Sequence, residues 1–338
     1  MTPFRSTLFF LLSLVTSQAF CQYTDVINSN RPGVSRSAFS VGTNVAQLEI
    51  GPYIVNEKHT PFQYEVSGFG VDFAARYGLL LEELEINIEG SYQNDTFTNN
   101  RSSIVDKSKR ANFKFLAIGA KYLVFDPYKN AEEDKPNLYS WKANRQFKWK
   151  SLIPAVSVYL GANYDIEPNP YTYFGIEGFS PKVMIATQNN FSGGWVFVMN
   201  LIKDRIGTDQ SDFQYILTLT HSFSPKWVVF GETQGIQSDF YADNLFRFGG
   251  AYLWGKDFQL DTAITFNTKD TPSILSVNFG ASYRLDFHKD KEVDNGTSAK
   301  DEGKRQANRK GKNKKKSKKE KDSIEKINKQ KKKDVDFD

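Results

Sequence analysis

The stretch Asp257–Asn267, DFQLDTAITFN, alternates strictly between two kinds of side chain. Polar or small residues occupy the odd positions, and apolar residues or threonine occupy the even ones. A repeat of two is typical of an extended strand whose two faces meet different surroundings. The stretch is about twice as long as an average globular strand and matches a tilted crossing of a bilayer. It therefore predicts a membrane-spanning β-strand, with the apolar face toward lipid and the polar face toward a lumen.

Glu83–Gln93 and Leu275–Phe287 repeat the same alternation over similar lengths. Extending the reading along the chain predicts an all-β fold, a transmembrane antiparallel up-and-down β-barrel of about twelve strands within residues 45–287. An even number of strands places both chain ends on the periplasmic side. A soluble sandwich of long strands is the alternative. The predicted strands are 45–55, 63–77, 83–94, 112–125, 151–163, 181–189, 194–202, 213–223, 226–236, 244–254, 257–267 and 274–287.

The lengths of the connections fit chain ends on the periplasmic side, since barrels have short periplasmic turns and longer extracellular loops. Asp126–Lys150 is an exception, because it is long and falls on the periplasmic side; it is either a small excursion or a missed pair of strands. The predicted turns are Asn189–Gly194, Ser224-Pro225 and Gly255-Lys256, and the predicted loops are Thr96–Ala111, Asp165–Ser180, Lys203–Asp212 and Gln237–Asp243.

The N-terminus, residues 1–21, has the pattern of a signal peptide. Arg5 precedes the apolar run Leu8–Val15, and small residues mark cleavage sites near Ala19 and Cys21. The apolar run is too short to span a bilayer as a helix. A lipoprotein acylated at Cys21 is the alternative, disfavoured by Phe20 just before it. Residues 22–44 would then form an N-terminal periplasmic segment.

The 338 residues combine low hydrophobic content, 39%, with 14% aromatic residues, which suits a barrel with aromatic girdles. Charge is concentrated at the C-terminus: Ala299–Asp338 holds 17 basic and 8 acidic residues. Residues 288–338 are therefore expected to be a disordered, Lys-rich periplasmic tail. Export removes nucleic acid as the leading partner. Peptidoglycan or an acidic periplasmic protein is the expected partner, and a solvated tail without one is the alternative.

The last predicted strand carries the pattern polar-x-Gly-x-x-aromatic-x-apolar, in Asn278, Gly280, Tyr283 and Leu285. This pattern resembles the signal by which the barrel-assembly machinery recognises its substrates. Together with outer-membrane lipid, that machinery is an expected partner.

Charged residues recur on the faces assigned to the lumen. Opposed rows of charge set the selectivity of a pore. Alternatively, these residues form salt bridges that plug a small lumen, since a twelve-stranded barrel lies between filled and open ones. The candidate lumen-facing residues are Glu49, Arg76, Glu83, Glu85, Glu89, Arg247, Asp261 and Arg284.

Catalysis is not expected. The chain has one cysteine, Cys21, and three histidines, with no zinc-type spacing. His221 and Ser222 are neighbours on a predicted strand, so their side chains point to opposite faces and cannot form a catalytic pair. No Gly-rich phosphate loop follows a strand. We therefore expect no catalytic, cofactor-binding or metal site, and no cofactor.

Several segments resemble a known family of outer-membrane proteins, the "MetA-pathway of phenol degradation" family. They are Asn28–Gly33 with Ala46–Gly51, and Phe248–Tyr252 with Phe258–Asp261, ending in Gly280–Leu285. The family typically opens on a Thr-Asp-Arg-Pro-like segment, where this chain has Ser29-Asn30 before Arg31-Pro32. The resemblance implies a barrel that passes small solutes, apolar or aromatic ones among them.

The sequence leaves two functions open. One is an outer-membrane barrel of a Gram-negative bacterium that passes small solutes passively. The other is a structural or scaffolding barrel, whose basic tail tethers it to peptidoglycan or to an envelope assembly.

Overall fold

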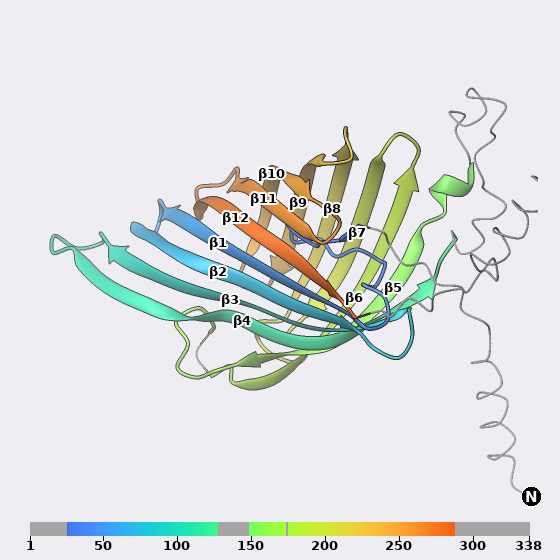
Figure 1. The fold of residues 1–338 in the computed structure, drawn as a ribbon. Helices are drawn as coiled ribbons and strands as arrows, with labels where there is room; N and C mark the ends of the chain where they lie inside the picture. The colour runs from blue at the N-terminus through green and yellow to red at the C-terminus, as the bar shows by residue number, and fades with distance from the viewer. Residues whose placement is uncertain (1–25, 128–148, 174, 288–338) are drawn as a thin grey trace, which may run out of the picture. The chain divides into compact units, whose positions relative to one another are not determined.

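The computed structural model describes residues 26–127, 149–173 and 175–287. The expected signal peptide, most of Asp126–Lys150 and the basic tail lie outside the described residues. The described chain forms twelve strands and one short 3-10 helix (Figure 1). The elements are β1 (Val45–His59), β2 (Tyr64–Gly78), β3 (Leu84–Asn99), β4 (Asp106–Phe125), η2 (Trp149–Leu152), β5 (Ala155–Asp165), β6 (Gly178–Phe191), β7 (Trp195–Asp204), β8 (Asp212–Ser222), β9 (Trp227–Ser238), β10 (Ala242–Trp254), β11 (Phe258–Asn267) and β12 (Ser273–Asp286).

The twelve strands close into a barrel. Each strand pairs antiparallel with the next, and β1 pairs with β12 from Val45↔Asp286 to Lys58↔Ser273. The predicted all-β, twelve-stranded antiparallel barrel is confirmed. β4 pairs directly with β5, and most of Asp126–Lys150 between them lies outside the described residues. We call the end where β1 begins and β12 ends the proximal end, and the opposite end the distal end.

The two faces of the wall differ as the alternation predicts. On β11, Gln259 and Asp261 are buried, whereas Leu260 and Ile264 are 40% and 42% exposed. Aromatic side chains such as Phe279 and Trp254 also point outward. An outward apolar face with aromatic residues is what lipid requires of a barrel wall. Among the described residues, no helix has the length and apolar character to cross a membrane.

β3 and β4 are longer than predicted, and their hairpin projects beyond the neighbouring strands at the distal end (Figure 1). Much of the predicted loop Thr96–Ala111 is paired strand, for example Thr98↔Lys107. Its polar composition suggested a loop, but backbone pairing does not require apolar side chains where the hairpin leaves the lipid. The predicted strand 151–163 begins later than expected, because the chain forms η2 at Trp149–Leu152 and β5 begins at Ala155.

The segment 26–44, which we call the inner segment, lies inside the barrel (Figure 1). Ile27 N–H donates to the carbonyl of Lys256, and Asn44 N–H donates to that of Gly78, so the segment enters and leaves at the proximal end. The sequence predicted a periplasmic segment for 22–44, and for 26–44 that expectation needs correction. The physical reason is that polar side chains of the wall satisfy the backbone groups of the segment.

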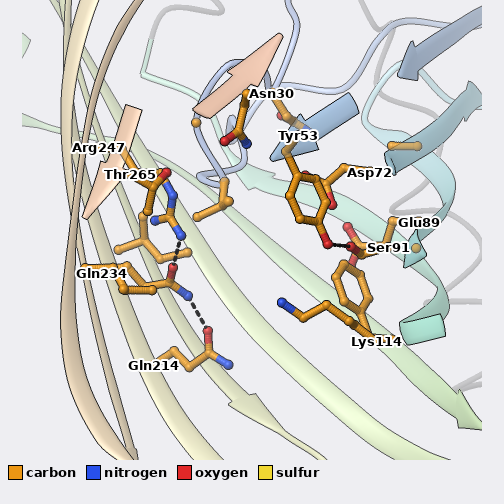
Figure 2. A pocket seen from close by; sticks show the side chains of 18 of the residues that line it. Asn30, Tyr53, Asp72, Glu89, Ser91, Lys114, Gln214, Gln234, Arg247 and Thr265 are labelled. Atoms are coloured by element: carbon orange, nitrogen blue, oxygen red, sulfur yellow. Dashed lines mark hydrogen bonds between the residues drawn. The ribbon is translucent and has the colours of Figure 1, made fainter. Parts of the chain in front are cut away.

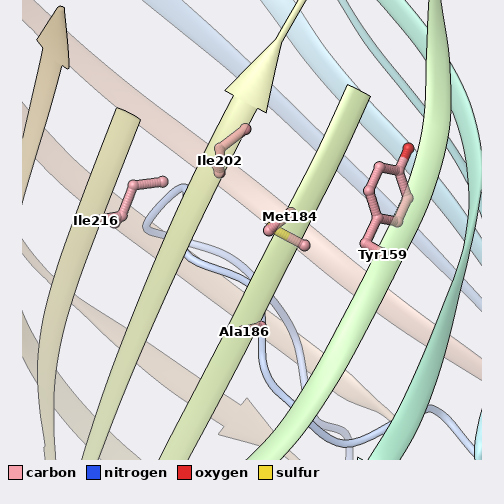
Figure 3. Packing of buried hydrophobic residues seen from close by; sticks show 5 residues of the cluster. All are labelled: Tyr159, Met184, Ala186, Ile202 and Ile216. Atoms are coloured by element: carbon pink, nitrogen blue, oxygen red, sulfur yellow. The ribbon is translucent and has the colours of Figure 1, made fainter. Parts of the chain in front are cut away.

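One part of the inner wall is apolar. Adjacent strands β5 to β8 present a cluster of buried side chains to the lumen (Figure 3). Barrel lumens are usually polar, so this apolar stripe is a distinguishing feature of the interior. Its members are Tyr159, Met184, Ala186, Ile202 and Ile216.

Candidate functional site: the lumen and its inner segment

A cluster of four charged side chains lies near the proximal end of the lumen. Arg76 donates twice to Glu85, at 2.9 and 2.8 Å, and lies 3.6 Å from Glu49. Lys121 lies 3.4 Å from Glu85. Buried charges are tolerated when they are paired and hydrogen-bonded in this way. The cluster also holds the inner segment, because Lys121 Nζ donates to the Ser37 carbonyl at 2.9 Å.

Arg31 of the inner segment inserts between two glycines on the strands that close the barrel. A Cβ at Gly51 of β1 would lie 2.0 Å from its guanidinium, and one at Gly280 of β12 would lie 2.3 Å from it. Arg31 Nη2 is 3.2 Å from an Asp261 carboxylate oxygen and donates to the Phe279 carbonyl at 3.3 Å. Only glycine leaves room for this close approach, so the two strands form a fitted seat for one side chain.

Farther from the proximal end, Glu232 of β9 binds the backbone of the inner segment. The backbone N–H groups of Val34 and Ser35 both donate to its carboxylate, at 3.1 to 3.2 Å. Arg247 Nη1 donates to the same carboxylate at 3.1 Å. A Cβ at Gly33 would lie 2.4 Å from the Glu232 carboxylate, so a larger residue there would displace that side chain.

Arg36 links the inner segment to the opposite wall. Its backbone N–H donates to the Asn200 side chain at 2.6 Å, and Asn200 donates back to the Arg36 carbonyl at 2.8 Å. Its guanidinium forms an ion pair with Glu89 and lies 4.9 Å from the ring centre of Tyr159. Lys182 continues the network, 3.5 Å from Glu89.

The inner segment therefore bonds to side chains from nine strands. Its partners on the wall run from the proximal strand ends to mid-strand, so the segment obstructs the proximal part of the lumen. These bonds are separate hydrogen bonds and ion pairs to side chains on different strands, and they do not form a continuous ladder. The partners are Gln47, Arg76, Glu85, Lys121, Gln188, Asn200, Glu232, Gln259 and Ser282.

A cavity of about 530 Å³ lies on the distal side of the inner segment. Asn30, Gly33 and Arg36 of the segment line the cavity from its proximal side. Figure 2 shows Arg247 with two glutamines on one side of the space, and Tyr53 and Lys114 on the other. Aliphatic side chains from β7 to β10 share the lining: Ile202, Ile216, Ile236 and Leu245. The cavity is thus a small chamber with both charged and apolar walls.

The structure brings most of the predicted charged residues into ion pairs inside the barrel. Glu49, Arg76 and Glu85 share one cluster, while Glu89, Asp261 and Arg247 pair with residues that the sequence reading did not select. Two candidates are placed differently from the rest. Glu83 lies in the turn before β3 and not on the strand, because β3 begins at Leu84. Arg284 is buried but pairs with Asp257 at 2.7 Å, beside the β10–β11 turn.

The four positions of the predicted assembly signal all lie on β12, the strand that pairs with β1 to close the barrel. Asn278 and Gly280 face the interior, where Gly280 makes room for Arg31. Tyr283 is 48% exposed on the outer face, and Leu285 is half-buried. Recognition by the assembly machinery stays a prediction.

Sequence reasoning missed the position of the inner segment and most of its partners on the wall, although it assigned Arg76 and Glu85 to the lumen. Arg31 and Gly33 were noted only as part of a family-like motif. Glu232 and Asn200 occupy lumen positions of alternating strands, but the alternation does not show what a lumen residue contacts. Within the described ranges, no group of three or more His, Cys, Asp or Glu side chains is arranged to hold a metal ion.

Several solved structures are similar to this chain. An outer membrane channel from Pseudomonas putida F1 matches with a TM-score of 0.50 at 8% identity, covering 77% of this chain and 100% of the channel. The toluene transporter TodX from Pseudomonas putida matches with a TM-score of 0.42 at 9% identity, covering 80% of this chain and all of the transporter. The KdgM porin matches with a TM-score of 0.41 at 8% identity, covering 71% and 99%. At 8% sequence identity, the similarity to the Pseudomonas putida F1 channel shows a shared fold and nothing more.

A comparison with curated proteins finds no match. The comparison with protein families matches residues 29–285, about three quarters of the chain, which includes the inner segment from Ser29 and all twelve strands to within one residue of the end of β12. The motifs that suggested the resemblance, Asn28–Gly33 and Gly280–Leu285, are the parts of the structure that meet where Arg31 is seated. The chain belongs to the family described as the MetA-pathway of phenol degradation.

Proposed function

We propose that the protein is an outer-membrane channel that passes small solutes passively, and that the inner segment restricts this passage. The observation that carries the proposal is the cavity of about 530 Å³ enclosed by the wall and floored by the inner segment. A purely structural barrel of this size could fill its lumen with side chains. A chamber with room for a small solute instead favours transport.

The lining of the chamber supports small solutes with apolar parts. Ile216 and Leu245 face the cavity from β8 and β10, where a simple water-filled pore would carry polar side chains. Contact with such residues stabilises an apolar surface by about 25 cal/mol per Å² removed from water. The description of the family, which refers to phenol, is consistent with solutes of this kind.

The way the inner segment is held supports a restriction that can open. A continuous β-ladder would separate only as a unit, whereas the segment is held by separate bonds from many strands. A typical hydrogen bond contributes about 1 kcal/mol net, so partial release of the segment from one side of the lumen is energetically accessible. Movement of the segment would join the chamber to the proximal end.

Solute flux tests the proposal. The mature protein is refolded into liposomes, folding is checked by heat-modifiable gel migration, and swelling is recorded in small sugars. We expect swelling above that of protein-free vesicles. A correctly folded barrel that gives no swelling in any small solute would contradict the proposal.

A further inference from the structure

We propose that the distal chamber is a binding site for small monocarboxylates with an apolar body, and that Lys114 binds the carboxylate. This inference rests on the proposed function, because it names the class of solute that the chamber selects. It is carried by three features of the chamber: a cation without an ion-pair partner, the bulge that directs it inward, and the apolar wall across from it.

Lys114 differs from the other cations that line the chamber. Those five are each held in an ion pair: Arg31 with Asp261, Arg36 with Glu89, Lys182 with Glu89 and Asp204, Arg205 with Asp165, and Arg247 with Glu232. Lys114 forms no ion pair with any described residue, and its side chain is exposed to the chamber. Figure 2 shows it extending into the space. It is the cation in the lining that can accept an anionic partner without breaking an existing pair.

A β-bulge places Lys114 in the lumen. The pairing of β3 with β4 shifts register here, because Ser91 lies opposite Phe115 while Tyr92 lies opposite Phe113. Lys114 is the extra residue. Strict alternation would send the neighbour of an inward side chain to the lipid face, but both Lys114 and Phe115 line the chamber. Bulges commonly redirect a side chain at a functional site. Here the bulge interrupts the β3–β4 ladder and directs the positive charge of Lys114 into the lumen.

The opposite wall supplies the apolar half of the site. Ile216, Ile236 and Leu245 stand on three successive strands, β8 to β10, and line the same chamber. Figure 2 shows the glutamines of these strands, Gln214 and Gln234, across the space from Lys114. Gln234 donates to Gln214 at 2.8 Å and accepts from Arg247, and Gln214 donates to Asp212, so both amides are engaged and the aliphatic side chains remain as the available surface. A ligand that spans the chamber would present a charge at one end and an apolar body at the other.

Charge decides between an acid and a neutral or cationic solute of the same shape. Asp72, the acidic residue of the lining that has no ion pair among the described residues, lies on the same side of the chamber as Lys114 and would disfavour an anion. Asp72 lies opposite Ser91 in the β2–β3 register and interacts electrostatically with Lys114, whose own side chain projects into the space. A charge-assisted hydrogen bond from an ammonium to a carboxylate is about twice as strong as a neutral one. The chamber should therefore prefer the acid.

Binding to the full chain in detergent micelles tests this without relying on transport. Line broadening of a fluorinated benzoate is compared with that of the neutral fluorinated benzamide by fluorine NMR, with empty micelles as the blank. We expect tighter binding of the benzoate. K114M should weaken benzoate binding by about tenfold, the loss expected for one charge contact, and leave benzamide unchanged. K114R should retain the preference. K109M, an exposed lysine of the same strand outside the chamber lining, is the matched control and should behave as wild type.

The apolar wall is tested separately with I236T, which should weaken benzoate and benzamide alike while leaving their ratio unchanged. Equal affinity of wild type for benzoate and benzamide, or an unchanged ratio in K114M, would overturn the inference. Failure of the proposed function would give a different experimental result from failure of this inference. Benzoate binding that depends on Lys114, in a protein that passes no solute through liposomes, would leave the site in place and remove transport.

Discussion

At the scale of single residues, Arg31 holds the inner segment against the strands that close the barrel. R31A removes one partner of a buried ion pair and leaves Asp261 uncompensated, a change that costs about 3–5 kcal/mol in other proteins. That cost falls on docking of the segment, because the wall keeps all of its ladder bonds. We predict faster liposome swelling for R31A, with unchanged heat-modifiable migration. Swelling at the wild-type rate would show that the seat of Arg31 does not hold the restriction.

Gly280 gives a second test of the same seat. In G280A the new Cβ would lie 2.3 Å from the Arg31 guanidinium, so the side chain must leave its position between the two strands. We predict that G280A swells faster, as R31A does, and that combining the two changes adds little. G250A is the matched control on β10, since a Cβ there would contact Val228 and Val229 of β9 and not Arg31. Additive effects of G280A and R31A would contradict a shared cause.

Tyr171 fastens the loop between β5 and β6 at the distal end. Its hydroxyl donates to Asp95 at 2.9 Å and to the Gln93 carbonyl at 3.2 Å. Burial, followed by the Asp95 carboxylate, raises the pKa of Tyr171 above its usual value. A raised pKa means that the neutral, donating form persists as pH rises and is lost only above the folded-state pKa. The contact should thus survive at a pH of about 10, where a free tyrosine is half ionised.

We predict that Y171F exposes this loop to cleavage by a Glu-specific protease at Glu167 or Glu177. Losing a hydrogen bond to a charged acceptor costs about 1.5–3 kcal/mol when buried, and less here because Tyr171 is half-buried. The wild-type loop should resist equally at neutral pH and at a pH of about 10. Y173F is the matched control, because it retains the ring of Tyr173 that packs in a tilted arrangement against Phe240. Equal cleavage of Y171F and wild type would contradict the role of the hydroxyl.

At the scale of elements, the strands were predictable from sequence and the loops less so. Alternation over β11 placed Gln259 and Asp261 inside and Leu260 outside, because lipid and lumen impose opposite demands on neighbouring residues. That demand stops where the wall leaves the lipid, which is why the β3–β4 extension reads as a loop although Thr96 pairs with Lys109. A bulge also resists prediction, since Lys114 breaks the alternation that identifies a strand.

The candidate site was predictable only in part, for a related reason. The sequence assigned Glu49, Arg76 and Glu85 to the lumen because they occupy the polar face. Partners such as Arg31 and Arg36 come from a segment without periodicity, whose position depends on backbone bonds to distant strands. The local sequence of such a segment does not indicate where it lies in the folded protein. Its Gly33 and Arg31-Pro32 motif becomes interpretable only once the facing Glu232 and Gly280 are known.

At the scale of the whole molecule, the barrel and the basic C-terminal sequence are separate questions. The stretch Ala299–Asp338 carries 17 basic and 8 acidic residues and lies outside the described structure. We propose that it binds anionic peptidoglycan by charge. Full-length protein should co-sediment with purified peptidoglycan more strongly than a version ending at Ser298, and added salt should abolish the difference. Equal sedimentation of both versions would contradict the tether.

We propose that solutes pass through the lumen only when the Ser29 end of the inner segment leaves β12, and a cross-link between the two tests this. The hydroxyls of Ser29 and Ser282 lie 2.7 Å apart, so cysteines at both positions should form a disulfide between the segment and β12. Swelling of liposomes that contain S29C/S282C is measured oxidised and then after reduction, with each single variant as control. We predict little swelling when oxidised and wild-type swelling when reduced. Equal swelling in both states would contradict the proposal, because solutes would then pass while the Ser29 end of the segment stays fixed to β12.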